Sequence, residues 1–172
     1  MKIGIIGSGN IGGGLARAWR RAGHAVTFGA RNPGDPELKD LCAETGAVAS
    51  TVAAAVQDAE VVVFAMPWRA LDDVLAATGP LEGKVVIDCT NAVGPGMTLL
   101  FGHTTSSGEE LQKRIPQARV VRAFNAQGAE NIADPVYGGV RATNFHCGDD
   151  PAAKGLVKRL VEDVGFEAVD AG

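Results

Sequence analysis

Apolar residues along this chain follow two patterns that alternate. Residues 60–66 (EVVVFAM) and 84–89 (KVVIDC) are continuous apolar runs, which is typical of central parallel strands covered on both faces. In residues 10–22, by contrast, apolar side chains such as Leu15 and Trp19 recur at the spacing of one helix face. Such strand and helix patterns alternate through nearly the whole chain. The alternation predicts an α/β fold with a doubly wound, mostly parallel sheet and helices on both faces.

The same patterns give the bounds of the predicted elements. We expect strands at 2–6, 25–29, 47–49, 60–66, 84–89, 118–124, 143–147 and 166–170, and helices at 10–22, 36–46, 51–57, 68–78, 106–115 and 151–164. No repeat, low-complexity tract or linker interrupts this order, so we predict one domain over residues 1–172. The stretches 91–105 and 125–142 have no predicted element, and long loops in compact α/β domains are often functional.

Two helices carry recognisable start signals. Ser107 followed by Glu110 fits a capping box at the start of the 106–115 helix. Asp150 followed by Pro151 predicts the start of the last helix, and Gly165 predicts its end.

Composition narrows the possible classes of protein. The formal net charge is -4 with no basic stripe, whereas nucleic-acid binders usually show a basic excess. The three cysteines lie far apart without metal-ligand spacing, which predicts free thiols in a reducing compartment and no metal site. Glycines interrupt the apolar N-terminal run, so it fits neither a signal peptide nor a membrane span. We therefore expect a cytoplasmic protein with neither nucleic acid nor a membrane as partner.

A glycine-rich turn follows the first predicted strand and opens the first predicted helix. Gly7, Gly9 and Gly12 have the G-x-G-x-x-G spacing of the dinucleotide-binding turn of Rossmann-type domains. Gly7 permits the tight turn, Gly9 lets the backbone approach a pyrophosphate, and Gly12 lets the helix pack closely on the strand. The amides of Asn10 and Ile11 would then point at the phosphates from the helix N-terminus. The sequence thus predicts a dinucleotide.

The end of the second predicted strand indicates which dinucleotide binds. NAD-binding domains usually carry an acidic residue there for the ribose 2′-hydroxyl, but residues 29–32 are Gly-Ala-Arg-Asn and the first carboxylate is Asp35. The guanidinium of Arg31 suits a 2′-phosphate, and Ser8 adds a hydroxyl donor. We therefore expect NADP(H), with Asn32 as a neighbouring contact.

Three further strand ends should lie at the same edge of the sheet, where ligands of such folds bind. They are Ala65, Met66, Pro67 and Trp68 after one strand, Thr90, Asn91 and Ala92 after the next, and Ala123, Phe124 and Asn125 after a third. The first group should pass the adenosine or pyrophosphate, and the other two should flank the nicotinamide. Asn91 and Asn125 suit a carboxamide or ring edge, whereas Trp68 fits either a substrate wall or plain packing.

The sequence shows no acid–base machinery, and we assign no catalytic residue. His24 lies in a predicted turn and is expected to be structural or exposed, His146 is expected in the core, and His103 lies in a long loop where a functional role is open. Hydride transfer between two redox cofactors requires positioning more than a protein nucleophile.

Several stretches together resemble one known family. They are IGIIGSGNIGGGLA, FGARNPGD, AMPW, DCTNAVGPG, GHTTSSGEEL, VVRAFNAQGAENIADP and CGDDPAAKGLVKRLVEDVGFEAVDAG. Over nearly the whole chain they are similar to the NADPH-dependent coenzyme F420 reductases (F420-dependent NADP oxidoreductases), and to the related domains of STEAP-type ferric reductases. The pyrroline-5-carboxylate reductase group shares only the N-terminal half.

The resemblance implies hydride transfer between NADPH and a deazaflavin (coenzyme F420) or a flavin (FMN or FAD), in a possible homodimer. It implies NADPH contacts at Ser8, Asn10, Ile11, Arg31 and Asn32, a nicotinamide near Asn91 and Ala123–Asn125, and a second-cofactor contact at His103. Trp68, Ala92 and Phe124 are further candidate substrate contacts. Family members often have serine where this chain has Ala30, and usually continue past the position of Gly172 into a helical segment, which is expected to be absent here.

Two other functions stay open on the sequence. One is an NADPH-dependent reductase of a small imine or carbonyl compound. The other is a non-catalytic NADP(H)-binding module that senses redox state or docks to a partner. The compound that oxidises NADPH, if any, separates the three hypotheses.

Overall fold

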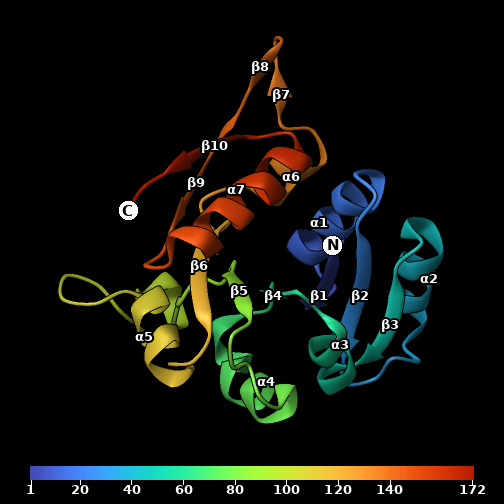
Figure 1. Ribbon diagram of the computed structural model, residues 1–172, viewed down its shortest axis with the longest axis horizontal. Helices are drawn as coiled ribbons and strands as arrows, with labels where there is room; N and C mark the ends of the chain where they lie inside the picture. Colours follow the sequence, from blue (N-terminus) through green and yellow to red (C-terminus); the bar gives the residue numbers. More distant parts are fainter.

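An eight-stranded sheet forms the centre of the protein, which is described here over residues 1–172 by a computed structural model (Figure 1). Its strand order is β10-β9-β6-β5-β4-β1-β2-β3. Strands β1 to β6 run parallel, β9 is antiparallel to β6, and β10 is parallel to β9. The expected doubly wound, mostly parallel α/β fold is therefore confirmed.

The elements follow one another closely along the chain. The strands are β1 (Lys2–Ile6), β2 (Ala25–Ala30), β3 (Val48–Thr51), β4 (Val61–Phe64), β5 (Val85–Asp88), β6 (Arg119–Ala123), β7 (Val136–Tyr137), β8 (Val140–Arg141), β9 (Thr143–Cys147) and β10 (Glu167–Asp170). The α-helices are α1 (Asn10–Arg21), α2 (Pro36–Thr45), α3 (Val52–Asp58), α4 (Leu71–Thr78), α5 (Ser107–Arg114), α6 (Ala129–Ala133) and α7 (Pro151–Val164), and two 3-10 turns are η1 (Trp68–Ala70) and η2 (Pro95–Met97).

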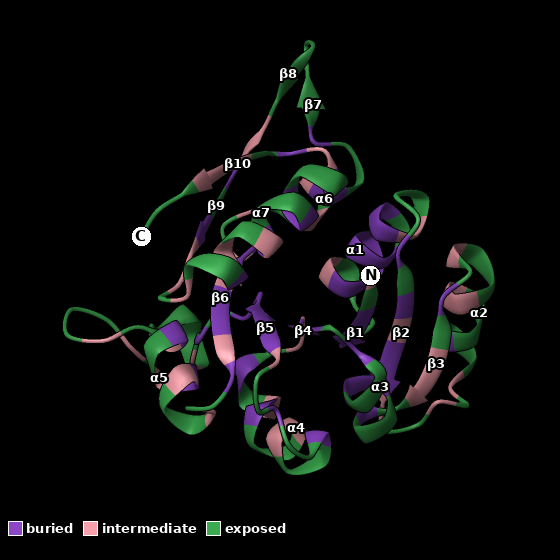
Figure 2. Ribbon diagram, viewed as in Figure 1, coloured by how far each residue is buried: buried purple, intermediate pink, exposed green.

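The two faces of the sheet carry separate hydrophobic cores. Because successive strand residues point to opposite faces, Val61 and Val63 join a cluster of 25 buried residues that includes side chains of α1 and α7. Val62 and Phe64 join a second cluster of 14 buried residues with side chains of α3, α4 and α5. Figure 2 shows the burial concentrated along the central strands. Because helices cover both faces of the sheet, both sets of strand side chains are buried, which explains why these strands are apolar throughout.

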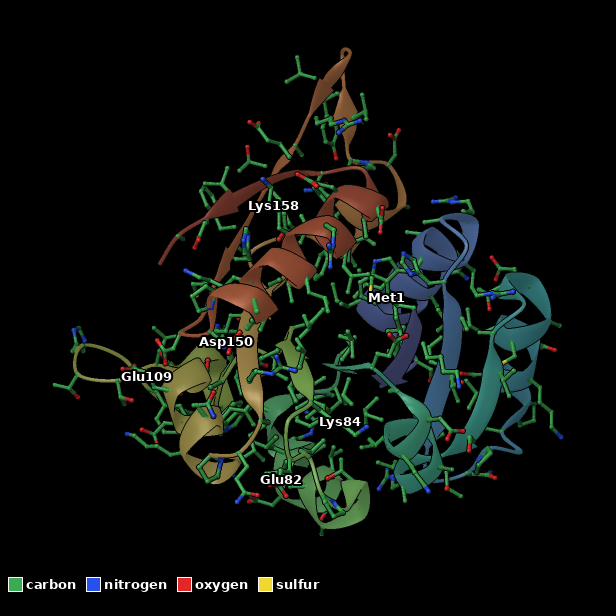
Figure 3. The ribbon with its side chains drawn as sticks, in the orientation of Figure 1. Met1, Glu82, Lys84, Glu109, Asp150 and Lys158 are labelled. Carbon is green, nitrogen blue, oxygen red and sulfur yellow. The ribbon has the colours of Figure 1, made fainter.

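Local side-chain chemistry begins and ends α7 as expected. The Asp150 carboxylate accepts a hydrogen bond from the Ala153 amide at 2.7 Å, and Pro151 occupies the first turn. Gly165 ends the helix with φ 114°, a left-handed conformation that glycine adopts without steric cost. Figure 3 labels Asp150 at the start of α7.

We expect Asp150→Ala to lower the free energy of unfolding by about 1 kcal/mol, because the Ala153 amide loses its acceptor. Urea unfolding monitored by circular dichroism measures this loss. The neighbouring exposed residue Asp149 makes no side-chain hydrogen bond, so Asp149→Ala should change stability by less than about 0.5 kcal/mol. Equal losses in both variants would contradict the capping role.

The capping box of α5 lies one residue earlier than the sequence predicts. The Glu109 amide donates to Ser106 Oγ at 3.2 Å, and the Ser106 amide donates to a Glu109 carboxylate oxygen at 2.6 Å. The sequence SSGEE contains two such pairs, Ser106 with Glu109 and Ser107 with Glu110, so the pattern fits either start of the helix. The capping box at Ser107 does not form, because Ser107 Oγ instead accepts a hydrogen bond from Arg122 Nη1 at 2.5 Å.

The two stretches without predicted elements contain short ones. Residues 91–105 include η2, and 125–142 include α6 and the β7–β8 hairpin, which projects from the body (Figure 1). Ile132 of α6 packs on α1, where a Cβ added at Gly14 would lie 3.0 Å from the Ile132 side chain. Gly14, which the turn motif does not explain, therefore allows α6 to approach α1. No helix in the structure is long and apolar enough to cross a bilayer.

Candidate functional site

The chain crosses from one half of the sheet to the other at β1, which lies between β4 and β2. Ligands of doubly wound folds bind beyond the carboxyl ends of the strands at this crossover. A cleft of about 280 Å³ is found there. Its lining residues are Ile6, Gly7, Ser8, Phe28, Gly29, Ala30, Arg31, Val52, Met66, Pro67, Ala70, Asp73, Val74 and Ala77.

The glycine turn borders this cleft at Gly7 and Ser8. Its glycines meet different physical demands. Gly7 has φ +112°, and a Cβ there would overlap the carbonyl oxygen of Ala65. A Cβ at Gly12 would overlap the carbonyl oxygen of Gly7, so α1 packs on the turn only with glycine at this position. A Cβ at Gly9 would meet no atom within 4 Å. The turn therefore leaves open space beside Gly9, as a bound pyrophosphate requires.

The first turn of α1 offers donors to this open space. Gly9 precedes the helix without a side-chain cap, and the amides of Asn10, Ile11 and Gly12 have no acceptor in the protein. Unpaired amides and the positive end of the helix dipole favour an anion at this position. The residues present thus fit the pyrophosphate of a dinucleotide.

The structure brings Arg31 and Ser8 to the same cleft, although 23 residues separate them. Arg31 is exposed and forms no ion pair or hydrogen bond within the protein, so its guanidinium is free for an anionic group. Asn32 lies beside it, with Oδ1 accepting from the Gly34 amide at 3.1 Å. That contact fixes the loop and leaves the Asn32 amide group free to donate.

The sequence did not indicate the apolar wall of the cleft. Met66 and Pro67 line it as expected, but Val52 from α3 and Ala70, Val74 and Ala77 from η1 and α4 line it too. Small aliphatic residues on an amphipathic helix are indistinguishable from ordinary core residues in sequence. The nearest signal is the pair of small residues Ala70 and Ala77, which lie seven positions apart, the first in η1 and the second in α4.

Beyond the next two strands, Asn91 and Asn125 are in contact. Asn91 Nδ2 donates to the backbone oxygen of Asn125 at 3.0 Å, which joins the loops after β5 and β6. The preceding residue, Phe124, has φ 64°, a left-handed conformation that costs a non-glycine residue on the order of 1–3 kcal/mol. Its amide donates to Asn144 Oδ1 at 3.2 Å in the interior. The fold therefore holds these loops in one defined arrangement.

Four of the candidate contacts have buried side chains. Phe124 is 1% exposed and lies between Trp19 and Phe166, Ala92 is buried, and Ala123 is fully buried, so only their backbones can border a ligand. Trp68 is also buried: its ring packs edge-on against Phe101, with centroids 5.5 Å apart.

The three histidines have different surroundings. His103 is exposed in the loop between η2 and α5, with φ 63°. His146 is buried as expected, and burial lowers its pKa, which favours the neutral ring. His24 is buried and bonded to Asp163 at 2.9 Å, which fits a structural role.

A buried ion pair supports the loop that carries Asn91, and sequence reasoning missed it. Asp88 is fully buried at the end of β5 and contacts Arg122 Nη1 at 2.6 Å. Arg122 also donates to the backbone carbonyl oxygen of Thr90 at 3.1 Å. The backbone amide and the side-chain hydroxyl of Thr90 both donate to the Asp88 carboxylate. The available signal was a charged residue, Arg122, inside the apolar run VVRAF.

The neighbouring thiol is not a nucleophile. Burial, with a smaller contribution from the Asp88 charge, raises the pKa of Cys89 well above its ordinary value. The thiol therefore stays protonated at neutral pH. No group of three or more His, Cys, Asp and Glu side chains is placed to hold a metal ion.

Comparison with known proteins supports the geometry. The family described as "NADP oxidoreductase coenzyme F420-dependent" matches residues 2–92, more than half of the chain and the part that contains the glycine turn, Arg31 and Asn91. The chain belongs to this family. Its description is that of NADP-dependent oxidoreductases, and the resemblance inferred from the sequence is confirmed.

Two similar proteins match essentially the whole chain. A structure from Arthrobacter sp. FB24, provisionally described as an F420-dependent NADP reductase, is 32% identical with a TM-score of 0.90, over 100% of this chain and 85% of that chain. Metalloreductase STEAP3 of Rattus norvegicus is 29% identical over 176 residues, which are 99% of this chain and 34% of the relative. This chain thus spans about a third of that relative.

A reductive aminase of Aspergillus terreus in complex with NADPH4, cyclohexanone and allyl amine is more distant. It is 21% identical, with a TM-score of 0.71 over 98% of this chain and 54% of that chain. This likeness shows the shared fold alone.

Proposed function

We propose that this protein binds NADPH across the crossover cleft and transfers a hydride between NADP(H) and a deazaflavin of the coenzyme F420 type or a flavin. One observation carries the NADP(H) site: Arg31, without any partner in the protein, lines the same cleft as the glycine turn. Its position at the end of β2 is where NAD-binding domains place an acid. The family description and the F420 assignment of the Arthrobacter relative support the acceptor.

Each group of residues has one role in this proposal. The Gly7–Gly12 turn and the first amides of α1 bind the pyrophosphate. Arg31, Ser8 and Asn32 bind the 2′-phosphate, and Ala65, Met66 and Pro67 border the adenosine. The linked loops of Asn91 and Asn125 hold the carboxamide of the nicotinamide, bordered by the backbone of Ala123.

The proposal assigns no catalytic residue, because hydride transfer between two redox cofactors requires positioning more than a protein nucleophile. NADPH supplies the hydride, and the protein orients it and excludes water. Reduction of a deazaflavin or a flavin takes up one proton together with the hydride, as reduction of an imine or a carbonyl compound does, so the proton does not distinguish these acceptors. The carboxyl group nearest in sequence to Asn91, Asp88, is fully buried and paired with Arg122, and the Cys89 thiol is buried.

Turnover assays with different acceptors test this assignment. Oxidation of NADPH in the presence of coenzyme F420, FMN or FAD, followed by absorbance, supports the proposal. Oxidation with imines or carbonyl compounds alone would replace it by the reductase hypothesis. Tight NADPH binding without oxidation by any of these compounds would replace it by the binding module.

We expect Arg31→Ala to weaken NADPH binding about ten- to hundredfold, because a charge-assisted bond to the 2′-phosphate is lost. NADH lacks this phosphate, so its affinity should stay within about twofold. Fluorescence titration of both cofactors measures the two dissociation constants. Arg21→Ala, at the exposed far end of α1, is the matched control and should bind both cofactors as the unchanged protein does. Comparable affinities of the unchanged protein for NADH and NADPH would contradict the proposal.

A further inference from the structure

The wall of the cleft formed by α4 carries a carboxylate that the proposed function does not use. Asp73 lines the cleft. Its side chain is exposed and forms no ion pair or hydrogen bond within the protein. The adjacent Asp72 does not line the cleft and instead contacts Arg114 Nη1 of α5 at 2.5 Å. The two neighbours on one helix therefore differ in direction, and only Asp73 is available to a ligand in the cleft.

The cleft combines three kinds of surface. A cation, Arg31, lies at the end of β2, apolar side chains of Val52, Val74 and Ala77 follow, and the anion Asp73 stands on α4. The adenosine end of NADPH offers matching groups: an anionic 2′-phosphate, a flat apolar purine face, and an amino group that donates hydrogen bonds. A partnerless carboxylate in an otherwise apolar part of the cleft is suited to a donor.

We propose that Asp73 accepts a hydrogen bond from the 6-amino group of the adenine and so selects the base of the cofactor. The inference rests on the proposed NADPH site and adds a specificity-determining residue to it. Arg31 distinguishes NADPH from NADH at the phosphate, and Asp73 distinguishes adenine from a 6-oxopurine at the base.

The physical basis is a mismatch of acceptors. The hypoxanthine analogue of NADPH has a keto oxygen where adenine has its amino group. Two acceptors would then face each other, and the carboxylate would lose its donor. Because Asp73 is exposed to water, which screens and competes, we expect a preference for adenine of about tenfold rather than the larger ratios of enclosed sites.

Asp73 also lies in the first turn of α4, where any carboxylate stabilises a helix. Asp72 shares that position in the first turn and that charge. Asp72→Asn is therefore the matched control: it removes the same charge from the same turn but leaves the cleft unchanged. Asp73→Asn retains size and adds an amide donor, which can bind a keto oxygen.

Dissociation constants of NADPH and its hypoxanthine analogue, measured by fluorescence titration on the three proteins, test the inference. The unchanged protein and Asp72→Asn should bind NADPH about tenfold more tightly than the analogue, and Asp73→Asn should bind both about equally. Equal binding by the unchanged protein, or an unchanged ratio in Asp73→Asn, would overturn the role of Asp73.

The affinity for NADH, measured on the same samples, separates this inference from the proposed function. One outcome is that all three proteins prefer NADPH to NADH while Asp73→Asn leaves the ratio of the affinities for NADPH and its hypoxanthine analogue unchanged. In that case only the inference about Asp73 fails. If the unchanged protein shows no preference for NADPH over NADH, the proposed NADPH site fails, and the inference that rests on it fails too.

Discussion

Replacing Gly12 by alanine is expected to lower kcat/KM with NADPH by about 100-fold or more, because displacements of about 1 Å at a binding turn have effects of this size. The added Cβ would overlap the carbonyl oxygen of Gly7 and would lie 3.2 Å from the Ile5 side chain. Both neighbours belong to β1 or to its end, so α1 must move away from the sheet. The phosphate-binding amides move with it. Steady-state kinetics and NADPH titration measure the loss.

Substitutions at two other glycines distinguish an effect on NADPH binding from an effect on folding. Gly9 has φ -71° and open space around its Cβ position, so Gly9→Ala should fold normally and lose affinity only for the dinucleotide. Gly155, on the exposed side of α7, also has open space, and Gly155→Ala should raise the stability by up to about 1 kcal/mol and bind NADPH normally. Normal NADPH binding by Gly12→Ala and Gly9→Ala would show that the turn does not hold the pyrophosphate.

Neutralising Asp88 should have the largest effect on stability. Asp88→Asn leaves the Arg122 guanidinium, whose side chain is 15% exposed, without its carboxylate. Removing one partner of a buried ion pair costs about 3 kcal/mol, since the remaining charge stays desolvated. The midpoint of urea unfolding should fall accordingly. Because Arg122 also holds the Thr90 oxygen, the KM for NADPH should rise in the folded protein.

The matched control is the exposed pair of the same residue types. Asp72, with 86% of its side chain exposed, contacts Arg114 at 2.5 Å. Asp72→Asn should cost less than about 1 kcal/mol, because water screens this pair. A similar loss of stability in both variants would show that burial does not determine the strength of the Asp88–Arg122 pair.

The predicted elements agreed with the structure where local chemistry decides the outcome. The continuous apolar run of β4 and the Asp150–Pro151 start of α7 depend on residues that are adjacent in the chain. The register of the α5 capping box was wrong by one residue because Ser107 is bound by Arg122, 15 residues away. The short α6 and the β7–β8 hairpin were missed because they have too few residues for a periodic pattern.

The candidate site also has features that local sequence indicates and features that depend on tertiary packing. The glycine spacing and Arg31 are local features, and the sequence alone indicated both a dinucleotide and its phosphate. The buried positions of Phe124 and Trp68 were not visible, because aromatic residues at strand ends occur both in cores and in ligand pockets. The side chains of Ala70, Val74 and Ala77 became part of the cleft only through the packing of η1 and α4 beside α3.

Sequence patterns were enough to predict the order of strands and helices, the dinucleotide turn and the cationic group at the end of β2. These features rest on backbone sterics, on hydrophobic periodicity and on side chains a few residues apart. The three-dimensional fold was needed to show that Arg31 and Asp73 share one cleft, that Asn91 holds Asn125, and that Asp88 is buried against Arg122. The physical reason is that such contacts join residues 34 or more positions apart, and their formation depends on how the strands pair and which helices cover each face.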